Sequence, residues 1–342
     1  MRVWVASVVI LLGGLLYLCG PRTYAHRRIV ALGDLHGDYA QALDVLRATH
    51  VLDAYTLHWA GGATVLVSTG DTVDRGDDTI ALYNMFASLR NESVQAGGRV
   101  ITLLGNHEMM NAMGDWRYVT PGDMASFGGA KARRHAMSMD GWLGREWLTN
   151  YAVTASVPLL EERAALALAP SLAHTLRASF VHGGLAPAWA RIGANTTNDI
   201  AHRLLRKALT APATYGAPPH DATREERELW SADGPLWYRG YALDAPKKAC
   251  ANAADAVDAL GVHTLVMGHT PQLGGIARRC SNDRLYIIDT GMSRAYGGRA
   301  SALVITSYLR RGWYGPVCAH TTYTAVYAHE GEQRLSHAVQ CA

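Results

Sequence analysis

Apolar segments alternate with segments of helical periodicity along the first third of this 342-residue chain, and this alternation constrains the fold most strongly. Segments 28–34, 64–71 and 99–106 have the short apolar runs that are typical of strands, whereas 39–53 and 77–97 have the spacing of amphipathic helices. Strands and helices in this order are typical of βαβ units. The sequence therefore predicts an α/β domain.

The second half of the chain has shorter, β-rich segments at 176–184, 262–270, 284–292 and 302–307. We expect these segments to add strands to a second sheet. No internal repeat or low-complexity linker separates the two halves.

Two stretches interrupt the pattern. Residues from about 109 to 150 contain scattered Gly, Met and Trp, and a helical pattern at 141–153 overlaps their end. We expect this stretch to be an insertion that could form one side of a site. Residues 211–228 are rich in proline and charge, which predicts a long surface loop.

The N-terminus has a separate character. One arginine precedes an uncharged apolar run that ends near residue 20, which is typical of a secretory signal or a signal anchor over residues 1–26. Cleavage before His26 and retention as a membrane anchor both remain open. In either case, residues 27–342 would form the main folded domain.

Two features agree with entry into the secretory pathway, with a lumenal, extracellular or, in a bacterium, periplasmic destination. The triplets that begin at Asn91 and Asn195 match the N-glycosylation signal. Outside the N-terminal segment the cysteines are even in number and lack CxxC metal spacing, which suits disulfides, with free buried thiols as the alternative.

Four cysteines allow three disulfide pairings, and their positions alone do not choose among them. A bridge between Cys250 and Cys280 would brace the predicted strand that precedes His269. A bridge between Cys318 and Cys341 would then hold the C-terminal tail.

Five apolar segments end in a polar cluster flanked by glycine. The clusters are GDLHG at 33–37, GDTVDRG at 70–76, GNHE at 105–108, VHGG at 181–184 and GHT at 268–270. In α/β sheets, ligands bind where the carboxyl ends of strands meet loops, and glycine allows a sharp turn close to a ligand. We expect the five clusters to meet at one site.

The residue types in these clusters are metal ligands of the carboxylate, imidazole and amide classes, which suit borderline or hard divalent cations. The candidate ligands are Asp34, His36, Asp71, Asn106, His182 and His269. They are too many for one catalytic ion with an open position. Shared between two ions by a bridging carboxylate, they predict a site that holds a hydroxide between cations about 3.5–4 Å apart.

The ordered set of motifs resembles the calcineurin-like metallophosphoesterases, and specifically the phosphoprotein phosphatase family of Ser/Thr phosphatases. The resemblance covers the chain from about Arg28 to Ser307. GPLWYRG at 234–240 and DTGMSRAYGGR at 289–299 look like the Shewanella-like phosphatase branch. The family's common SAPNY stretch is absent, which leaves strict Ser/Thr preference and sensitivity to the usual toxin inhibitors open.

This resemblance implies an αββα sandwich of two mixed β-sheets flanked by helices. It also implies two divalent metal ions, of Mn, Fe or Zn. Their ligands would be Asp34 and His36 for the first ion, Asp71 as the bridge, and Asn106, His182 and His269 for the second ion.

The same resemblance assigns roles beside the metals. Arg75 and Arg239 would bind the phosphate oxygens, for which a planar guanidinium is well matched. His107 would protonate the leaving group, with Asp74 as its partner. For Glu108 we expect a hydrogen bond to neighbouring groups, because the ligand positions are already filled.

The predicted function is a metal-dependent phosphoprotein phosphatase acting on a phosphoprotein or phosphopeptide by attack of the hydroxide held between the metals. A small-molecule phosphohydrolase, such as a dinucleoside polyphosphate hydrolase, would use the same centre. A nuclease is disfavoured, because a net charge of +3 without a long basic run offers little to nucleic acid. A non-catalytic binding protein would be expected to lack a ligand or the Asp74–His107 pair, and all are present.

Overall fold

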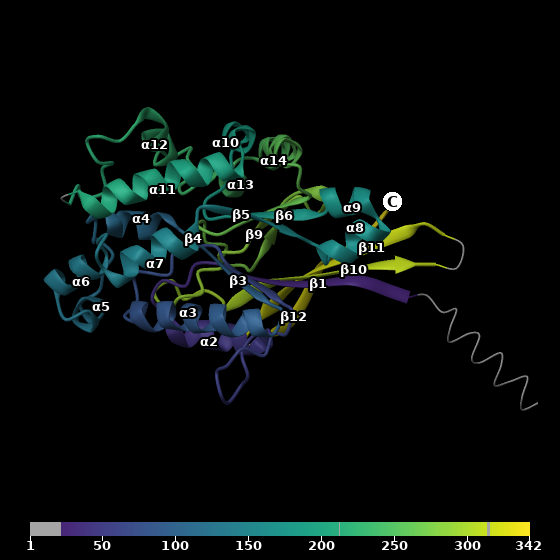
Figure 1. Ribbon diagram of the computed structural model, residues 1–342, viewed down its shortest axis with the longest axis horizontal. Helices are drawn as coiled ribbons and strands as arrows, with labels where there is room; N and C mark the ends of the chain where they lie inside the picture. The colour runs from purple at the N-terminus through teal and green to yellow at the C-terminus, as the bar shows by residue number, and fades with distance from the viewer. Residues whose placement is uncertain (1–21, 212, 313–314) are drawn as a thin grey trace, which may run out of the picture.

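The computed structural model describes residues 22–211, 213–312 and 315–342 of the chain. Within these residues, two mixed β-sheets form the centre and helices flank them on both sides (Figure 1). The predicted α/β class and αββα sandwich are confirmed. Most of the predicted N-terminal segment lies outside the described residues, and its last five residues, 22–26, are already part of the first strand.

One sheet contains seven strands within the described part of the chain, in the order β12-β11-β10-β1-β2-β3-β4. These strands span Gly331–Cys341, Val317–Tyr327, Ser301–Arg311, Arg22–Leu32, Val65–Ser68, Arg99–Leu103 and Tyr151–Ala152, respectively. β1, β2 and β3 are parallel, whereas β10, β11 and β12 are antiparallel to their neighbours.

The other sheet contains five strands among the described residues, in the order β5-β6-β7-β9-β8. They span Thr154–Pro158, Arg177–Val181, Thr264–Met267, Leu285–Ile287 and Ala277–Arg278, respectively. β6, β7 and β9 are parallel, so their carboxyl ends lie at the same edge. The later β-rich segments therefore form the predicted second sheet.

Helices surround the two sheets (Figure 1). They are α2 (Tyr39–Ala48), α3 (Thr79–Gln95), α4 (Asn106–Ala112), α5 (Pro121–Ser126), α6 (Ala130–Ala136), α7 (Trp142–Asn150), α8 (Glu162–Leu168), α9 (Pro170–Thr175), α10 (Pro187–Ile192), α11 (Ala194–Thr210), α12 (Arg224–Leu229), α13 (Gly240–Leu243) and α14 (Pro246–Leu260), with a 3-10 turn η1 (Ser281–Asp283). None of these helices has the length and apolarity needed to span a bilayer.

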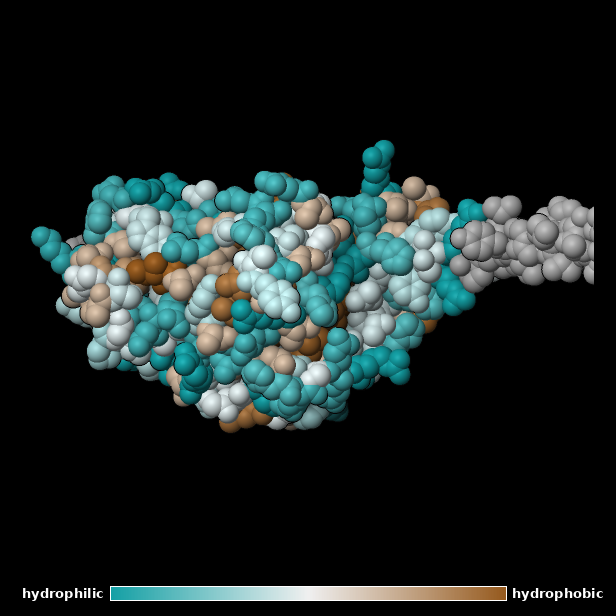
Figure 2. Space-filling view, turned by 90° about the horizontal axis from the view of Figure 1, so that it is seen from below, coloured by the Kyte–Doolittle hydropathy of each residue, from teal (hydrophilic) through white to brown (hydrophobic). Residues whose placement is uncertain are grey.

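In the described part of the chain, three buried hydrophobic clusters separate the four layers. One contains Leu46 of α2 and Phe86 of α3 against β1, and a second lies between the sheets, where Ile29 and Phe180 are fully buried. The third joins the second sheet to α7, α11 and α14 and includes Trp147. The face that carries α2 and α3 shows mostly hydrophilic side chains, with apolar ones in small separate patches (Figure 2).

Helix α2 shows how local sequence sets the bounds of an element. The Asp38 side chain accepts a hydrogen bond from the Gln41 backbone N–H and caps the first turn. At the other end, the Thr49 hydroxyl donates to the Val45 carbonyl oxygen at 2.8 Å, and His50 has a φ of 50°. The helix therefore ends at Ala48, before the predicted end at residue 53.

The predicted surface loop at 211–228 is wrong in its last part, because α12 begins at Arg224. Thr223 and Glu226 form a capping box in which each side chain binds the other residue's backbone N–H. Glu226 is fully buried and pairs with Lys207 at 2.8 Å. The charges that suggested a solvated loop are thus partly satisfied inside the protein.

Two disulfides are present among the described residues. Cys250 of α14 is bonded to Cys280, just before η1, and Cys318 of β11 is bonded to Cys341 at the end of β12. This pairing is the one that would brace the strand before His269 and the C-terminal tail. The tertiary structure thus chooses one of the three possible pairings.

Candidate metal centre and active site

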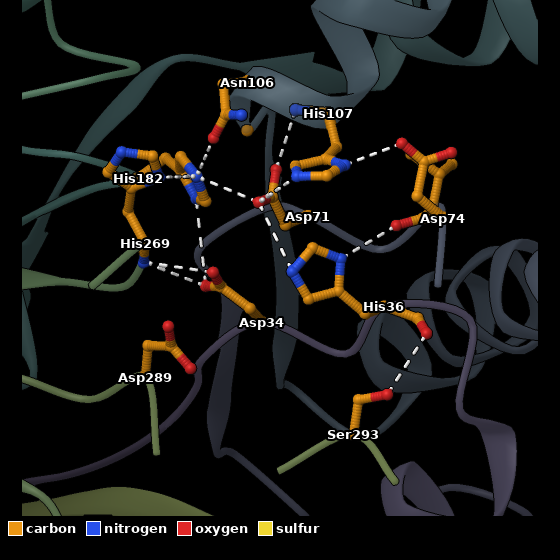
Figure 3. Close-up of polar contacts among 12 residues, drawn as sticks. Asp34, His36, Asp71, Asp74, Asn106, His107, His182, His269, Asp289 and Ser293 are labelled. Carbon is orange, nitrogen blue, oxygen red and sulfur yellow. Dashed lines mark hydrogen bonds and ion pairs between the residues drawn. The ribbon is translucent and has the colours of Figure 1, made fainter. Parts of the chain in front are cut away.

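Loops after β1, β2, β3, β6 and β7 bring the five polar clusters together (Figure 3). One pocket of about 630 Å³ is lined by eight of the predicted site residues: Asp34, His36, Asp71, Arg75, Asn106, His107, Arg239 and His269. The other two, Asp74 and His182, hydrogen-bond members of this set. All ten residues predicted from the sequence are therefore gathered at one place.

The loop backbones are unusual at this place. A left-handed conformation, with φ between 45° and 69°, occurs at His36, Asp71, Asp74, Arg75 and His269. Non-glycine residues seldom adopt it, and such backbone strain tends to gather at functional sites. At Gly105 a Cβ atom would overlap the Asp71 carboxylate, so only glycine allows these two loops to approach.

The Asp71 carboxylate lies at the centre of the site. Its Oδ2 is 3.7 Å from Nε2 of His36, 3.8 Å from Nε2 of His107 and 3.3 Å from Nε2 of His182. Ligand atoms of His36, Asp71 and His107 all lie within 4.8 Å of one another, and so do those of Asp71, His182 and His269. Asp71 alone belongs to both groups, as a bridging carboxylate would.

Two of the histidines are held in a defined tautomer. Nδ1 of His36 donates to the Val73 carbonyl oxygen at 3.1 Å, and Nδ1 of His182 donates to the Thr69 carbonyl oxygen at 3.0 Å. In the neutral rings Nε2 then carries a lone pair that faces Asp71. A hydrogen bond from the other ring nitrogen to a backbone carbonyl oxygen is a common way to orient a histidine ligand.

Further lone pairs converge on His182. Its Nε2 lies 2.9 Å from Oδ1 of Asn106 and 3.1 Å from Nδ1 of His269. The Nε2 atom of His269 is buried without a hydrogen-bond partner among the described residues. Lone pairs that converge in a buried site are stabilised by a cation, and this mixture of imidazole, amide and carboxylate suits a borderline divalent ion. The residues present therefore fit a metal.

Asp34 lies at the edge of this arrangement. Both its oxygens accept from the His269 backbone N–H at 3.1 Å, and Oδ1 is 3.9 Å from Nδ1 of His182. Burial raises the pKa of Asp34 well above its ordinary value, and the charges of Asp289 and Asp71 raise it further. Burial also raises the pKa of Asp289 to about 6. We did not predict Asp289, although it follows β9 as the other acids follow their strands.

His107 differs from the other histidines. Its Nδ1 lies 2.6 Å from Oδ2 of Asp74, which is fully buried. Burial lowers its pKa, but the charge of Asp71 and the hydrogen bond to Asp74 outweigh burial, so the pKa of His107 is raised. Burial lowers the pKa of His36 to about 4. By distance, His107 rather than Asp34 completes the compact group around His36.

Glu108 supports the loops, as expected. Its carboxylate accepts from the backbone N–H groups of Asp71, Thr72 and Gly105 at 2.7–2.9 Å. The Tyr83 hydroxyl donates to it at 3.1 Å. Glu108 therefore ties the loop after β2 to the loop after β3, and it does not line the pocket.

The two predicted arginines, Arg75 and Arg239, line the pocket together with Arg117. Nη1 of Arg239 donates to the His269 carbonyl oxygen at 2.8 Å. The guanidinium of Arg75 lies over the rings of Tyr118 and Tyr296, and its buried Nε has no hydrogen-bond partner among the described residues. We did not predict Tyr118 or Tyr296, and no motif in the sequence marks Tyr118.

The family assignment follows from the sequence as a whole. A sequence model described as Calcineurin-like phosphoesterase matches residues 27–273. The chain belongs to this family. The metallophosphoesterase assignment agrees with the buried carboxylate and histidine groups that share Asp71.

Curated relatives place the chain near one branch of the family. An uncharacterised protein of Schizosaccharomyces pombe is 38% identical over 81% of this chain and 77% of the relative. Shewanella-like protein phosphatase 2 of Arabidopsis thaliana is 26% identical over 78% of this chain and 72% of the relative. Shewanella-like protein phosphatase 1 of Plasmodium berghei is 28% identical over 78% of this chain and 67% of the relative. The chain is thus a metallophosphoesterase related to the Shewanella-like protein phosphatases.

Solved structures agree on the fold. A crystal structure described as a cold-active protein-tyrosine phosphatase of a psychrophilic Shewanella species has a TM-score of 0.68 and 22% identity. The match covers 91% of this chain and 80% of the Shewanella chain. The likeness shows that the two proteins share a fold.

Proposed function

We propose that this chain is a metal-dependent phosphoprotein phosphatase that hydrolyses phosphate monoesters on a protein or peptide. The observation that carries the proposal is the position of Asp71, which belongs to two groups of ligand atoms in one pocket. Arg75 and Arg239 line the same pocket. The names of the Arabidopsis and Plasmodium relatives support the choice of a protein substrate.

The proposed ligands are Asp34, His36 and Asp71 for one metal, and Asp71, Asn106, His182 and His269 for the other. Two divalent cations bound there, of Mn, Fe or Zn, would activate water and withdraw charge from the phosphoryl oxygens. The backbone carbonyl contacts of His36 and His182 keep their rings aimed at Asp71.

The arginines would bind the substrate phosphate. A guanidinium offers several N–H donors in one plane, which match phosphate oxygens. The contact of Arg239 with the His269 carbonyl oxygen uses Nη1 and leaves its other nitrogen atoms for the phosphate. The rings of Tyr118 and Tyr296 restrict the motion of Arg75, so less entropy is lost when the phosphate binds.

His107 would supply the proton that the leaving oxygen needs. Its Nδ1–H is held by Asp74, so Nε2 is aimed toward Asp71 and the pocket. A proton on Nε2 can then pass to the oxygen of a serine, threonine or tyrosine leaving group. Asp74 stabilises the protonated ring in its low-dielectric surroundings.

Aromatic walls shape the pocket outside the centre, with Tyr118, Tyr296, Trp230 and Trp237 among its lining residues. Such walls suit a phosphotyrosine ring, and the Shewanella structure is described as a protein-tyrosine phosphatase. They would also suit the purine of a dinucleoside polyphosphate. This second substrate class is the alternative that needs a direct test.

The test compares kcat/KM of the full, metal-loaded chain on a phosphoserine peptide, a phosphotyrosine peptide and a dinucleoside tetraphosphate, with Asp71→Asn as the inactive control. We expect turnover of at least one phosphopeptide and much slower turnover of the dinucleotide. The opposite ranking would replace the protein phosphatase assignment by the small-molecule one. Activity that survives in Asp71→Asn would contradict the proposed two-metal centre.

The proposed location is the secretory pathway, either free in its lumen or anchored through the predicted N-terminal segment, whose last residues, 22–26, belong to β1. The two disulfides support an oxidising compartment. Treatment of the cell-made protein with an N-glycosidase tests glycans at Asn91 and Asn195, and alkaline extraction of membranes separates an anchored form from a free one. A reduced, unglycosylated protein in the cytosol would contradict this proposal.

A further inference from the structure

A buried chain of polar side chains connects helix α6 to the pair formed by Asp74 and His107. Arg133 of α6 is 0% exposed, and its Nη1 donates to Oδ1 of Asn111 at 2.7 Å. Nδ2 of Asn111 donates to Oδ1 of Asp74 at 3.0 Å. The other oxygen of Asp74 binds Nδ1 of His107 at 2.6 Å (Figure 3). Three successive contacts thus link Arg133 to the proposed proton donor.

The amide of Asn111 has only one orientation that satisfies both neighbours. An ionised Asp74 can only accept hydrogen bonds, and Arg133 can only donate them. The Asn111 oxygen must therefore face Arg133 and its NH₂ group must face Asp74. The same Nδ2 also donates to the His107 carbonyl oxygen at 2.9 Å, which ties the amide to the first turn of α4. Arg133 consequently fixes the orientation of the Asn111 amide, and with it the direction of the hydrogen bond that Asp74 accepts.

The charges around Arg133 point the same way. Its Nε and Nη2 each lie 3.0 Å from Oδ2 of Asp123, and Nη2 lies 3.7 Å from Oδ1 of Asp74. A buried guanidinium is costly unless it is paired, and here it faces two buried carboxylates. The rings of Trp116 and Phe127 lie 5.1 Å and 5.4 Å from its central carbon and complete the enclosure. Asp123 thus pairs with Nε and Nη2, and Nη2 also lies near Asp74.

We propose that Arg133 is a positioning residue for proton transfer to the leaving group. It acts through Asn111 and Asp74, and it keeps the His107 ring aimed at the pocket. This inference rests on the proposed function, in which His107 protonates the leaving oxygen. Without the contact to Arg133, the Asn111 amide and the Asp74 carboxylate can turn, and the ring loses its fixed direction.

The first experiment uses Arg133→Lys in the full, metal-loaded chain. Lysine keeps a charge beside Asp123 but cannot reach both Asp123 and Asn111 as the guanidinium does. We expect kcat on a phosphoserine peptide to fall on the order of 10-fold, a fraction of the roughly 10²–10⁴-fold contribution of a general acid. On p-nitrophenyl phosphate, whose leaving group needs no proton, kcat should fall less than about twofold. Equal losses on both substrates with intact metal content would overturn the positioning role.

Two further variants control for folding and charge. Asn111→Ala breaks the link without changing any charge, and it decides the question if Arg133→Lys does not fold. The same selective loss on the phosphoserine peptide is expected, and an unselective loss would overturn the inference. Asp123→Asn weakens the ion pair with Arg133, so it should lower the melting temperature. It keeps the contact between Arg133 and Asn111, so the ratio of kcat on the phosphoserine peptide to kcat on p-nitrophenyl phosphate should not change.

His107→Asn separates this inference from the proposed function. If His107→Asn slows both substrates equally, the proposed proton donor is wrong and the inference falls with it. If His107→Asn is selective while Arg133→Lys and Asn111→Ala are not, only the positioning role fails. In the His107→Asn background, Arg133→Lys should cause no further selective loss, because both changes act on the same proton transfer.

Discussion

The guanidinium carbon of Arg75 lies 4.3 Å from the centre of the Tyr118 ring, and the Arg75 backbone N–H donates to the Tyr118 carbonyl oxygen at 2.9 Å. A second ring, that of Tyr296, lies 4.7 Å from the same carbon. Tyr118 belongs to the loop between α4 and α5, so this loop fixes both the backbone and the side chain of the proposed phosphate ligand. The proposed substrate contact is thus built from two distant parts of the chain.

Tyr118→Ala should raise KM for phosphopeptides about fivefold, because a cation–π contact contributes about 1 kcal/mol and 1.4 kcal/mol corresponds to about tenfold. Steady-state kinetics on the metal-loaded protein measures this change. Tyr118→Phe keeps the ring and should retain the original KM. A normal KM in the alanine variant would show that Arg75 needs no aromatic support.

Asp71→Asn should abolish activity and lower the metal content, because a neutral amide cannot supply the charge that one carboxylate gives to two cations. Metal analysis of the purified protein, together with turnover, measures both effects. Asp115→Asn is the matched control, because Asp115 lines the same pocket but belongs to neither ligand group. Full metal occupancy in Asp71→Asn would argue against the bridging position.

His107→Asn should reduce kcat toward phosphoserine by about 10²–10⁴-fold and toward p-nitrophenyl phosphate much less. The physical reason is that an alkoxide is a poor leaving group without a proton, whereas p-nitrophenolate departs unaided. Kinetics with both substrates at equal metal content makes the comparison. A uniform loss would assign His107 to metal binding with His36 and Asp71, with which its ligand atoms are also grouped.

Removal of metals with a chelator should abolish activity and lower the melting temperature. Ions that bind only the folded protein stabilise it by mass action, by about 2.7 kcal/mol at about 100 times Kd. Calorimetry before and after chelation measures the shift, and adding back Mn, Fe or Zn should restore both properties. An unchanged melting temperature with full activity would contradict the metal centre.

Replacing Cys250 and Cys280 by alanine should lower the free energy of unfolding by about 3 to 4 kcal/mol, according to the chain-entropy estimate for a loop of this size. Replacing Cys318 and Cys341 by alanine is the matched control, because this disulfide closes a loop of similar length. His269 lies between Cys250 and Cys280 in the chain, so we expect only the first pair to reduce metal content as well. Denaturant unfolding and metal analysis together test this difference.

Local sequence was enough to find the residues that gather at the centre. Each of Asp34, Asp71, His182 and His269 follows an apolar strand and neighbours a glycine. The carboxyl ends of parallel strands meet at one edge, so the pattern that predicts the strands also predicts which side chains converge. Asp289 likewise follows an apolar strand, β9, with a glycine two residues later, and could have been found in this way.

Other features were decided only by the tertiary structure. Nothing in the irregular stretch from 109 to 150 marks Asn111, Tyr118 or Arg133, because their importance comes from contacts across loops and helices and not from any local period. The cysteine pairing was likewise open until the folded chain brought particular thiols together. The sequence shows which side chains lie at the end of a strand, because a strand is recognised from its local pattern. The contacts of Asn111, Tyr118 and Arg133 with the site depend on how the layers pack against one another. That packing is a property of the whole chain.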